Sequence, residues 1–484
     1  MGYQPRAKPH QSLGDSRGLY GCIKPMSACL PSNFAWPQTS QQFGGLRVLM
    51  PQPSPSQMLQ LVEHLRSSAS TLQRIPSTTI VAAIDRAAQQ WLAPDYPPRW
   101  QLLDQLPQIN GYSLAMLNEV LDRMLADWRA PQLWQRLNEQ FSDPLVLDGW
   151  RPSVVGESRV VGPRLTWHIC AGNVPGVAIQ SLIDGLLVKS PSLVKVARGE
   201  PLWAAAFATS LIEQLPELAD SIAVLWWSGG DQVLEAPILA SAEAIIANAS
   251  DAAIAAVRQR SPAHIRWLDY GSRYSLAYLS QSMLASPNLA EIASKLAYDS
   301  VILEQQGCVS PQAIVVEAPT TEQLSQLGLA LNQALADLSQ RYPASSSILA
   351  ATRRSADDYE WQALSGQPIQ LLSQPDQPWL VVVDQREALP SAAGRLIKLV
   401  PVTDWAEFEQ RLKPLHQHLQ SVTLVCSAAQ RHELAEALAA IGVMRICQAG
   451  QQAFPQAAWH HDGRDPLRSL VRWVDLERSA DPRV

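Results

Sequence analysis

A cysteine in a polar, turn-forming segment is the first feature of the sequence that could carry out chemistry. Cys308 lies in LEQQGCVSPQ (303–312), between a glycine and a valine and ahead of a Ser-Pro pair, and the chain has only six cysteines. A thiolate is a nucleophile that attacks carbonyl groups, whereas a thiol in apolar surroundings is inert. Taken alone, the segment fits either role about equally well.

Two predicted strand ends supply further polar side chains. The strand RLTWHIC (164–170) runs into CAGNVPG (170–176), where Asn173 and Pro175 fit the N-cap and first turn of a helix. The strand SLVKVA (192–197) ends beside Lys195 and Arg198. These two cations are either solvated charges or groups that hold the adenosine ribose of a cofactor.

The elements that must position these residues follow a regular order. From residue 164 to 268, short apolar strands alternate with amphipathic helices. This alternation predicts a parallel, doubly wound sheet, and ligands of such sheets bind at the carboxyl ends of the strands. A second α/β stretch follows Cys308, with strands predicted in AIVVE, WLVVV, LIKLVPV and SVTLVC.

The rest of the chain completes a four-part organisation. Residues 1–45 are rich in Gly, Pro, Ser and Gln and are expected to be a poorly ordered lead-in. Residues 46–268 are expected to hold a helical N-terminal part and a nucleotide-binding domain, and residues 269–450 a catalytic domain. Residues 451–484 are expected to form a C-terminal tail with an amphipathic helix in DPLRSLVRWVDLE, as an interface.

Composition excludes several classes of protein. The 484 residues are 47% hydrophobic and 17% charged, with a formal net charge of -6, so nucleic acid is not an expected partner. No apolar run reaches the length of about 18 residues that a membrane span needs. The cysteines are scattered, which predicts neither a disulfide framework nor a metal site and fits the cytoplasm.

Several segments resemble a known family. Asn173-Val174-Pro175, Lys195 and a cysteine in a later domain are arranged as in the aldehyde dehydrogenase superfamily. More specifically, the sequence resembles bacterial long-chain acyl-CoA reductases of the LuxC type in EQQGCVSPQ (304–312), LDGW (147–150), WLDYGSRYSLAYL (267–279) and AWHHDGRDPLRSLVRWVDLE (458–477). The resemblance implies an aldehyde-dehydrogenase-like α/β fold, in which a doubly wound parallel-sheet nucleotide-binding domain accompanies an α/β catalytic domain.

The resemblance also implies catalytic roles. Cys308 would attack an acyl-CoA, and the oxyanion would accept hydrogen bonds from the Asn173 side chain and the Cys308 backbone N–H. Hydride from a nicotinamide would then reduce the acyl-enzyme to an aldehyde. Asp269 stands where aldehyde-oxidising relatives have a glutamate that activates water. Because aspartate is one methylene shorter, we expect the acyl-enzyme to survive hydrolysis.

The cofactor site follows from the same resemblance. Lys195 and Arg198 would bind the adenosine ribose, and Gly229, Gly230 and Ser250 would complete the site. Relatives that prefer NAD have a glutamate in the place of Arg198, which repels a 2′-phosphate, whereas an arginine grips one. We therefore expect NADPH as the cofactor, with NADH as the alternative. The aldehyde dehydrogenase segment that holds the nicotinamide ribose has no clear counterpart here.

Two other functions remain open. An aldehyde dehydrogenase that oxidises aldehydes to acids is disfavoured by Asp269, and a non-catalytic member that binds acyl groups or a partner synthetase is disfavoured by Cys308 and Asn173. The expected partner of a reductase is acyl-CoA or an acylated partner protein, and the resemblance favours a homo-oligomer. His168 is expected in the core, and His460 and His461 in a structural or interface role.

Overall fold

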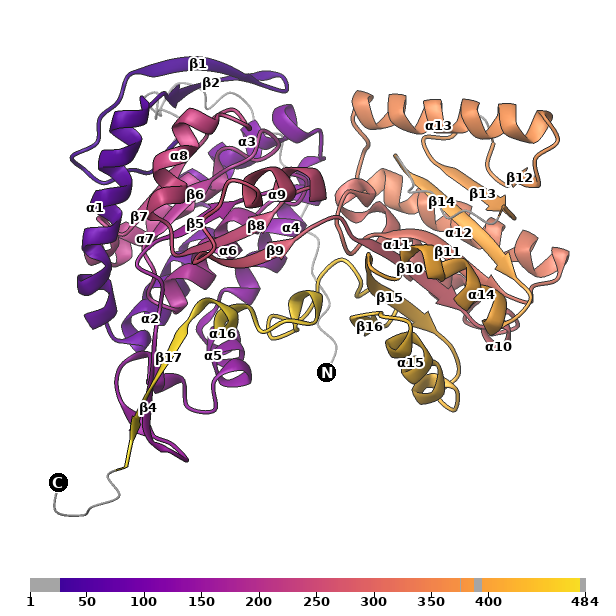
Figure 1. Ribbon diagram of the computed structural model, residues 1–484. Helices are drawn as coiled ribbons and strands as arrows, with labels where there is room; N and C mark the ends of the chain where they lie inside the picture. The colour runs from indigo at the N-terminus through magenta and orange to yellow at the C-terminus, as the bar shows by residue number, and fades with distance from the viewer. Residues whose placement is uncertain (1–26, 375, 387–393, 479–484) are drawn as a thin grey trace.

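Two α/β domains lie side by side, and the C-terminal segment crosses from the second back to the first (Figure 1). The computed structural model describes residues 27–374, 376–386 and 394–478. The expected combination of a doubly wound domain and a second α/β domain is confirmed.

The first domain is built on a five-stranded parallel sheet in the order β7-β6-β5-β8-β9. Chain order reverses between β5 and β8, which creates the crevice where ligands of such sheets bind. The strands are short and buried on both faces, as parallel strands are. Their bounds are β5 (Thr166–Ile169), β6 (Ser192–Lys195), β7 (Ile222–Leu225), β8 (Ala244–Asn248) and β9 (Arg266–Tyr270).

Helices cover both faces of this sheet. Side chains of α1 and α8 pack on one face, and those of α2, α6 and α7 on the other. The helical N-terminal part that the sequence predicts consists of α1 (Pro55–Arg74), α2 (Ser77–Leu92), α3 (Pro97–Asn110), α4 (Leu114–Asp127) and α5 (Ala130–Gln140). The helices between strands are α6 (Val177–Leu187), α7 (Trp203–Gln214), α8 (Gln232–Ser241) and α9 (Asp251–Arg258).

The second domain has a seven-stranded sheet in the order β12-β13-β14-β11-β10-β15-β16, in which only β12 runs antiparallel to its neighbour. Its strands are β10 (Tyr274–Leu279), β11 (Pro311–Glu317), β12 (Ile369–Leu371), β13 (Leu380–Asp384), β14 (Leu396–Val402), β15 (Leu419–Val425) and β16 (Arg445–Cys447). Its helices are α10 (Gln281–Leu284), α11 (Leu289–Val301), α12 (Thr321–Arg341), α13 (Ser346–Leu364), α14 (Trp405–Leu412) and α15 (Arg431–Ala440). Helices α11 and α12 pack on one face of this sheet, and α14 and α15 on the other.

The C-terminal segment differs from the expected amphipathic helix. Helix α16 (Pro466–Leu470) is short, and β17 (Arg472–Glu477) follows it and pairs with β4 (Gly156–Val161). With β3 (Arg151–Pro152) these strands form a separate three-stranded sheet. The helical prediction for these last residues is wrong because pairing with β4 supplies backbone hydrogen bonds that sequence spacing does not reveal.

The start of the chain also differs from the expectation of a poorly ordered lead-in through residue 45. Residues 1–26 lie outside the described part of the chain, but β1 (Gln38–Phe43) pairs with β2 (Leu46–Pro51). Upstream of this hairpin, the backbone of Cys29 exchanges two hydrogen bonds with Val224 on β7. Residues 27–45 are therefore part of the fold.

Candidate active site

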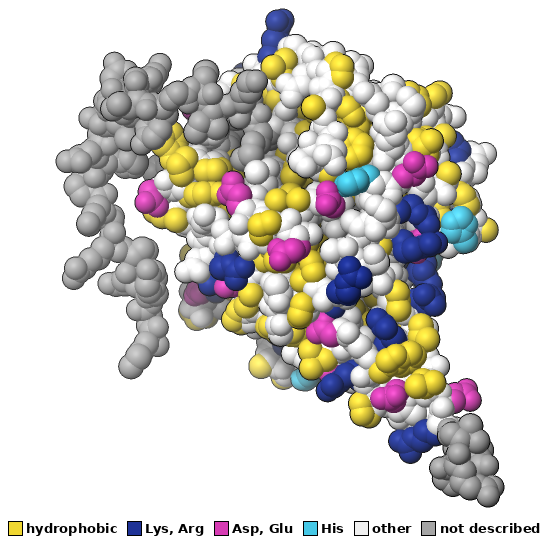
Figure 2. Space-filling view, turned by 90° about the vertical axis from the view of Figure 1, so that its left-hand side faces the viewer, with side chains coloured by type: hydrophobic (Ala, Val, Ile, Leu, Met, Phe, Trp, Pro, Cys, Tyr) yellow, Lys and Arg dark blue, Asp and Glu magenta, His cyan; other side chains and the backbone are white. Residues whose placement is uncertain are grey.

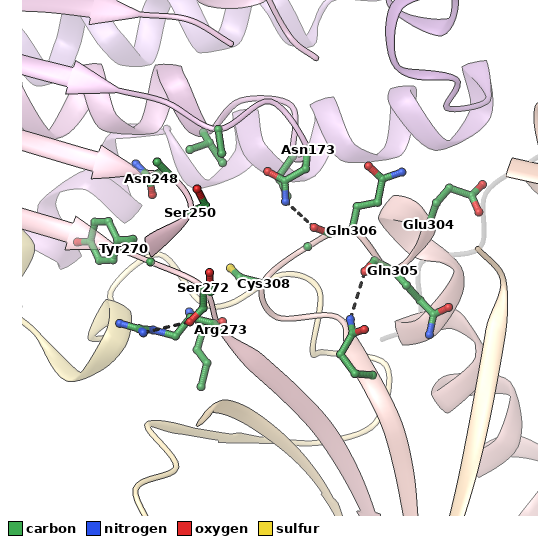
Figure 3. A pocket seen from close by; sticks show the side chains of 18 of the residues that line it. Asn173, Asn248, Ser250, Tyr270, Ser272, Arg273, Glu304, Gln305, Gln306 and Cys308 are labelled. Carbon is green, nitrogen blue, oxygen red and sulfur yellow. Dashed lines mark hydrogen bonds between the residues drawn. The ribbon is translucent and has the colours of Figure 1, made fainter. Parts of the chain in front are cut away.

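Cys308 lies between the two domains, in the segment that joins α11 to β11. The side chain is exposed to solvent, and Figure 3 shows its sulfur pointing into the space bordered by Asn173, Ser250 and Ser272. Ser275 donates a hydrogen bond of 2.8 Å to the Cys308 carbonyl oxygen, which fixes the backbone of the cysteine from β10. The polar segment that the sequence singles out is thus a fixed loop beside open space.

The backbone just before Cys308 is strained. Leu303, Glu304 and Gln305 have φ angles of 60°, 50° and 56°, in the left-handed region that residues other than glycine rarely adopt. Each such residue costs on the order of 1–3 kcal/mol and persists only where its surroundings enforce it. The backbone is therefore held in this shape by its contacts.

Two buried side chains enforce this shape. The Glu304 carboxylate forms an ion pair with Arg395 through contacts of 2.8 and 2.6 Å, and both side chains are fully buried. Arg395 also donates to the Tyr342 carbonyl oxygen at 2.6 Å. The Gln305 amide donates to the Leu396 carbonyl oxygen at 2.7 Å and accepts from the Leu396 N–H at 3.0 Å. These contacts tie the cysteine loop to β14 and to Arg395, the residue just before this strand.

The buried ion pair gives a stability prediction. Glu304→Gln is expected to lower the free energy of unfolding by about 3–5 kcal/mol, because Arg395 keeps its charge in a buried position without its partner. Urea unfolding of both proteins measures this difference. Glu291→Gln is the matched control, since Glu291 pairs with Lys295 at the surface and its loss should have little effect. Equal midpoints for wild type and Glu304→Gln would contradict the prediction.

Asn173 lies between β5 and α6 and reaches the cysteine loop from the first domain. Its side-chain amide donates a hydrogen bond to the Gln306 carbonyl oxygen, two residues before Cys308 (Figure 3). The Tyr112 hydroxyl donates to the Asn173 carbonyl oxygen at 2.5 Å and lies 3.3 Å from the Leu303 carbonyl oxygen. Tyr112 thereby joins the two segments that carry Asn173 and Cys308, and sequence reasoning missed it because it lies far away in the helical part.

Two cavities meet at Cys308. The larger has a volume of about 680 Å³ and the smaller about 170 Å³, and Cys308 lines both. The larger cavity is bordered by Asn173, Asn248, Ser250, Ser272, Gln306 and Gln420, among others. The smaller is bordered mainly by apolar side chains, among them Met124, Val174, Ile246, Leu303 and Trp459. A reactant on Cys308 can therefore be approached from two sides.

Although the Cys308 side chain reaches solvent, the protein packed around its sulfur keeps the thiol protonated. Loss of hydration raises its pKa to about 11, and the nearby Asp462 carboxylate raises it further, whereas hydrogen bonding to Gln420 and to the backbone lowers it. A thiol with so high a pKa needs a group that accepts its proton when it attacks a carbonyl.

Asp269 lies outside both cavities. It is part of β9, and its carboxylate contacts Arg464 at 3.1 Å and Arg258 at 3.2 Å. These contacts outweigh partial burial and lower the pKa of Asp269, so the group is ionised and engaged. The next two residues, Tyr270 and Gly271, line the larger cavity instead. The structure thus brings Cys308 and Asn173 together but leaves Asp269 in a separate ion-pair cluster.

The expected cofactor residues lie at the carboxyl ends of β6, β7 and β8. Ser250 caps α9 by accepting from the Ala253 N–H, and it lines the larger cavity. Gly229 and Gly230 are exposed with open space around them, and Gly230 has a φ of 81°. Gly229, Gly230, Lys195 and Arg198 line neither of the two cavities, whereas Ser250 lines the larger.

Lys195 and Arg198 are engaged with aromatic rings. Lys195 lies 5.4 Å from the centre of the Trp227 ring, and burial lowers its pKa. Arg198 lies over Phe43 and Trp226 and donates to the Gln42 carbonyl oxygen at 2.6 Å. The hairpin of β1 and β2 therefore borders the position expected for the adenosine ribose.

The histidines occupy different environments. His168 is fully buried on β5 and contacts the Ser181 hydroxyl at 2.7 Å, as expected of a core histidine. His460 lies at the surface, 3.3 Å from Asp465. His461 lines both cavities beside Cys308, which the sequence reasoning did not anticipate.

Metal-ligating clusters and membrane-spanning helices are both absent from the described residues. No group of three or more His, Cys, Asp or Glu side chains there could hold a metal ion. None of the described helices is long and apolar enough to cross a membrane.

Comparison with known proteins gives two kinds of match. A protein-family model described as acyl-CoA reductase (LuxC) matches residues 72–473. The chain is 25% identical over 437 residues to the long-chain acyl-protein thioester reductase of Vibrio harveyi. The aligned stretch covers 87% of this chain and 86% of that protein.

Solved structures match in fold. An NAD-dependent benzaldehyde dehydrogenase from Corynebacterium glutamicum superposes with a TM-score of 0.67 and 14% identity, over 94% of this chain and 99% of that one. An NADP-dependent enzyme of E. coli superposes with a TM-score of 0.69 and 11% identity, over 93% of this chain and 97% of that one. The expected aldehyde-dehydrogenase-like fold is confirmed.

Proposed function

Because the chain belongs to the LuxC family of acyl-CoA reductases, we propose that it reduces a long-chain acyl thioester to the aldehyde, with NADPH as reductant and Cys308 as the acylated residue. The observation that carries this proposal is the position of Cys308, where the smaller, mainly apolar cavity meets the larger one, which the Asn173 side chain borders. The family model supports the reaction class, and the geometry supports the assignment of residues.

The first step is acylation of Cys308. The sulfur attacks the thioester carbonyl, and the tetrahedral oxyanion is stabilised by the Asn173 amide and the Cys308 backbone N–H. An amide nitrogen carries two hydrogens, and the contact with Gln306 uses one of them. The acyl chain occupies the apolar cavity, since Met124, Val174, Ile246 and Leu303 suit a hydrocarbon.

The second step is reduction of the acyl-enzyme. A nicotinamide held on the side of Ser250, in the larger cavity, would supply the hydride. The thiohemiacetal then collapses to the aldehyde and frees Cys308. Among the described residues, the carboxylate that lines the larger cavity belongs to Glu304, which Arg395 holds. Asp269 is also engaged elsewhere, so neither of these two carboxylates is free to activate water, which favours reduction over hydrolysis.

The proposed acyl donor is acyl-CoA or an acylated partner protein. The name of the Vibrio harveyi relative, an acyl-protein thioester reductase, supports the second source. The proposed compartment is the cytoplasm, where the thiol stays reduced. We also propose a homo-oligomer, since the sheet of β3, β4 and β17 projects from the body (Figure 1) and Val154, Trp473 and Leu476 in and beside it are exposed. Figure 2 shows hydrophobic side chains at this narrow end of the molecule.

Product analysis tests the function. The full chain is incubated with a long-chain acyl-CoA and NADPH, and the products are separated. We expect aldehyde and free CoA in equal amounts, with little fatty acid. Fatty acid as the main product, or oxidation of added aldehyde without reduction of the thioester, would instead support the aldehyde dehydrogenase alternative.

Cofactor preference gives a prediction for Arg198. Arg198→Glu is expected to shift the ratio of catalytic efficiencies with NADPH and NADH toward NADH by about one to two orders of magnitude, because a charge-assisted bond to the 2′-phosphate is lost. Loss of the Gln42 contact affects both cofactors alike and cancels in the ratio.

The control for Arg198 is Arg47→Glu. Arg47 is a cation on the same hairpin, and it contacts the Gln42 side chain at 3.3 Å. This variant should leave the ratio unchanged. An unchanged ratio in Arg198→Glu would mean that Arg198 does not contact the 2′ position.

A further inference from the structure

The junction of the two cavities is the place where the proposed acylation occurs. Six residues line both cavities: Val174, Val177, Asn248, Tyr270, Cys308 and His461. Of these, only Tyr270, Cys308 and His461 can exchange a proton. Burial raises the pKa of the Tyr270 hydroxyl far above its usual value, so the phenol does not ionise near neutral pH. Of these six residues, His461 is therefore the one that can accept the proton of the Cys308 thiol.

The His461 ring is held without using its nitrogens. It stacks on Tyr270 with ring centres 3.9 Å apart and on Trp459 with centres 4.7 Å apart. Among the described residues, neither ring nitrogen has a hydrogen-bond partner. A histidine in the core normally satisfies at least one nitrogen, as His168 does through Ser181. The His461 nitrogens are therefore available to a reactant in the cavities.

The backbone of the histidine is anchored by its neighbour. Asp462 is buried and has a φ of 54°, and its carboxylate accepts from Arg273 and from the Gln420 amide, each at 2.6 Å. These contacts tie the C-terminal segment to the start of β10 and to β15. They fix the turn that presents His461, so the ring keeps one position at the junction of the two cavities.

The charges around the ring leave it neutral. Burial lowers the pKa of His461 to about 4, Asp462 opposes this shift, and Arg273, Arg136 and Arg464 reinforce it. At neutral pH the imidazole therefore has a free lone pair, while the Cys308 thiol still carries its proton. The thiol holds its proton more tightly than the imidazole would, so the transfer takes place as the sulfur–carbon bond forms and the sulfur loses its basicity.

We propose that His461 carries the proton of the acylation step. This inference rests on the function proposed above. As the Cys308 sulfur attacks the thioester, the imidazole takes the S–H proton and returns it to the sulfur of the leaving thiol. The bond between Cys308 and the acyl carbon forms, the bond between that carbon and the donor sulfur breaks, and one proton moves from sulfur to sulfur. The step needs neither oxidant nor reductant.

The test compares two thioesters of one acyl chain, an acyl-CoA and a thiophenyl ester, in single-turnover acylation without cofactor. An aryl thiolate leaves without being protonated, so acylation by the thiophenyl ester depends less on a general acid. His461→Phe keeps an aromatic ring beside Tyr270 and Trp459 but removes both nitrogens. We expect His461→Phe to lower the rate of acylation by acyl-CoA about 10²–10³-fold. The rate of acylation by the aryl ester should fall by a factor at least about ten times smaller.

Two further variants make the result decisive. His461→Gln, which removes the ring, should show the same difference between the two esters. His460→Phe alters the exposed neighbouring histidine and should acylate at the wild-type rate. Equal slowing with both esters, or no slowing, overturns the role of His461 while wild-type acylation leaves the proposed function intact. Absence of acylation in wild type overturns both.

Discussion

Cys308→Ala is expected to abolish acylation of the protein. Labelled acyl-CoA should label wild type without cofactor and leave the variant unlabelled, and reductase turnover should fall by about five to six orders of magnitude, as happens when a nucleophile is removed. The reason is that no other cysteine of the described chain borders the two cavities. Mass spectrometry of the intact protein measures the label directly.

Another cysteine provides the control for this prediction. Cys426 is partly exposed and lies at the end of β15. Cys426→Ala should be labelled like wild type. Labelling of Cys308→Ala at the wild-type level would assign the acyl group to a different residue and remove the basis of the proposed mechanism.

The second large effect is expected at Asn173. Asn173→Ala should lower turnover by about two to three orders of magnitude, because one donor to the oxyanion is lost. The affinity for NADPH should change little, since Asn173 does not belong to the proposed ribose site. Steady-state kinetics and a fluorescence titration with NADPH measure the two quantities.

The contact between Asn173 and Gln306 requires a second measurement, because the variant could also disturb the cysteine loop. Alkylation of Cys308 by iodoacetamide forms no oxyanion and therefore reports on the loop alone. We expect near-normal alkylation together with slow acylation. If both rates fall equally, Asn173 only positions the loop.

Most of the sheet architecture could be predicted because it depends on local patterns. The strands near Trp167, Val194 and Ile246 are short apolar runs bounded by polar turns, and each is a buried parallel strand in the structure. Asn173 and Cys308 also fall where the motifs place them. Such features are encoded within a few residues of each other, so spacing and composition reveal them.

The features that sequence reasoning missed depend on distant contacts. Strand β17 forms because β4, far away in the chain, offers an edge to Trp473 and its neighbours. The left-handed backbone at Glu304 exists because Arg395 is buried beside it. Helix α13 has few buried side chains, and its sequence accordingly carries a weak apolar pattern. Neither the pairing of β17 with β4 nor the ion pair of Glu304 with Arg395 leaves a periodic signal in the sequence.

The candidate site shows the same division. Asp269 was expected in the site by analogy of position, yet Arg258 and Arg464 engage it elsewhere. The sequence predicts a structural or interface role for His461 because its segment lacks metal-ligand spacing, yet the residue lines the same two cavities as Cys308. Which polar group faces a cavity is decided by the turn that carries it, and here that turn depends on Asp462 and its partners.

The central claim is that the acyl group on Cys308 is the species that becomes aldehyde. The most direct test is to acylate the full chain with labelled acyl-CoA, remove the unbound ester, and then add NADPH to the isolated acyl-enzyme. The account predicts that the label leaves Cys308 as aldehyde in a single turnover, faster than it is lost as acid in buffer alone. Release of the label as fatty acid, or its retention on the protein after NADPH is added, would contradict the account.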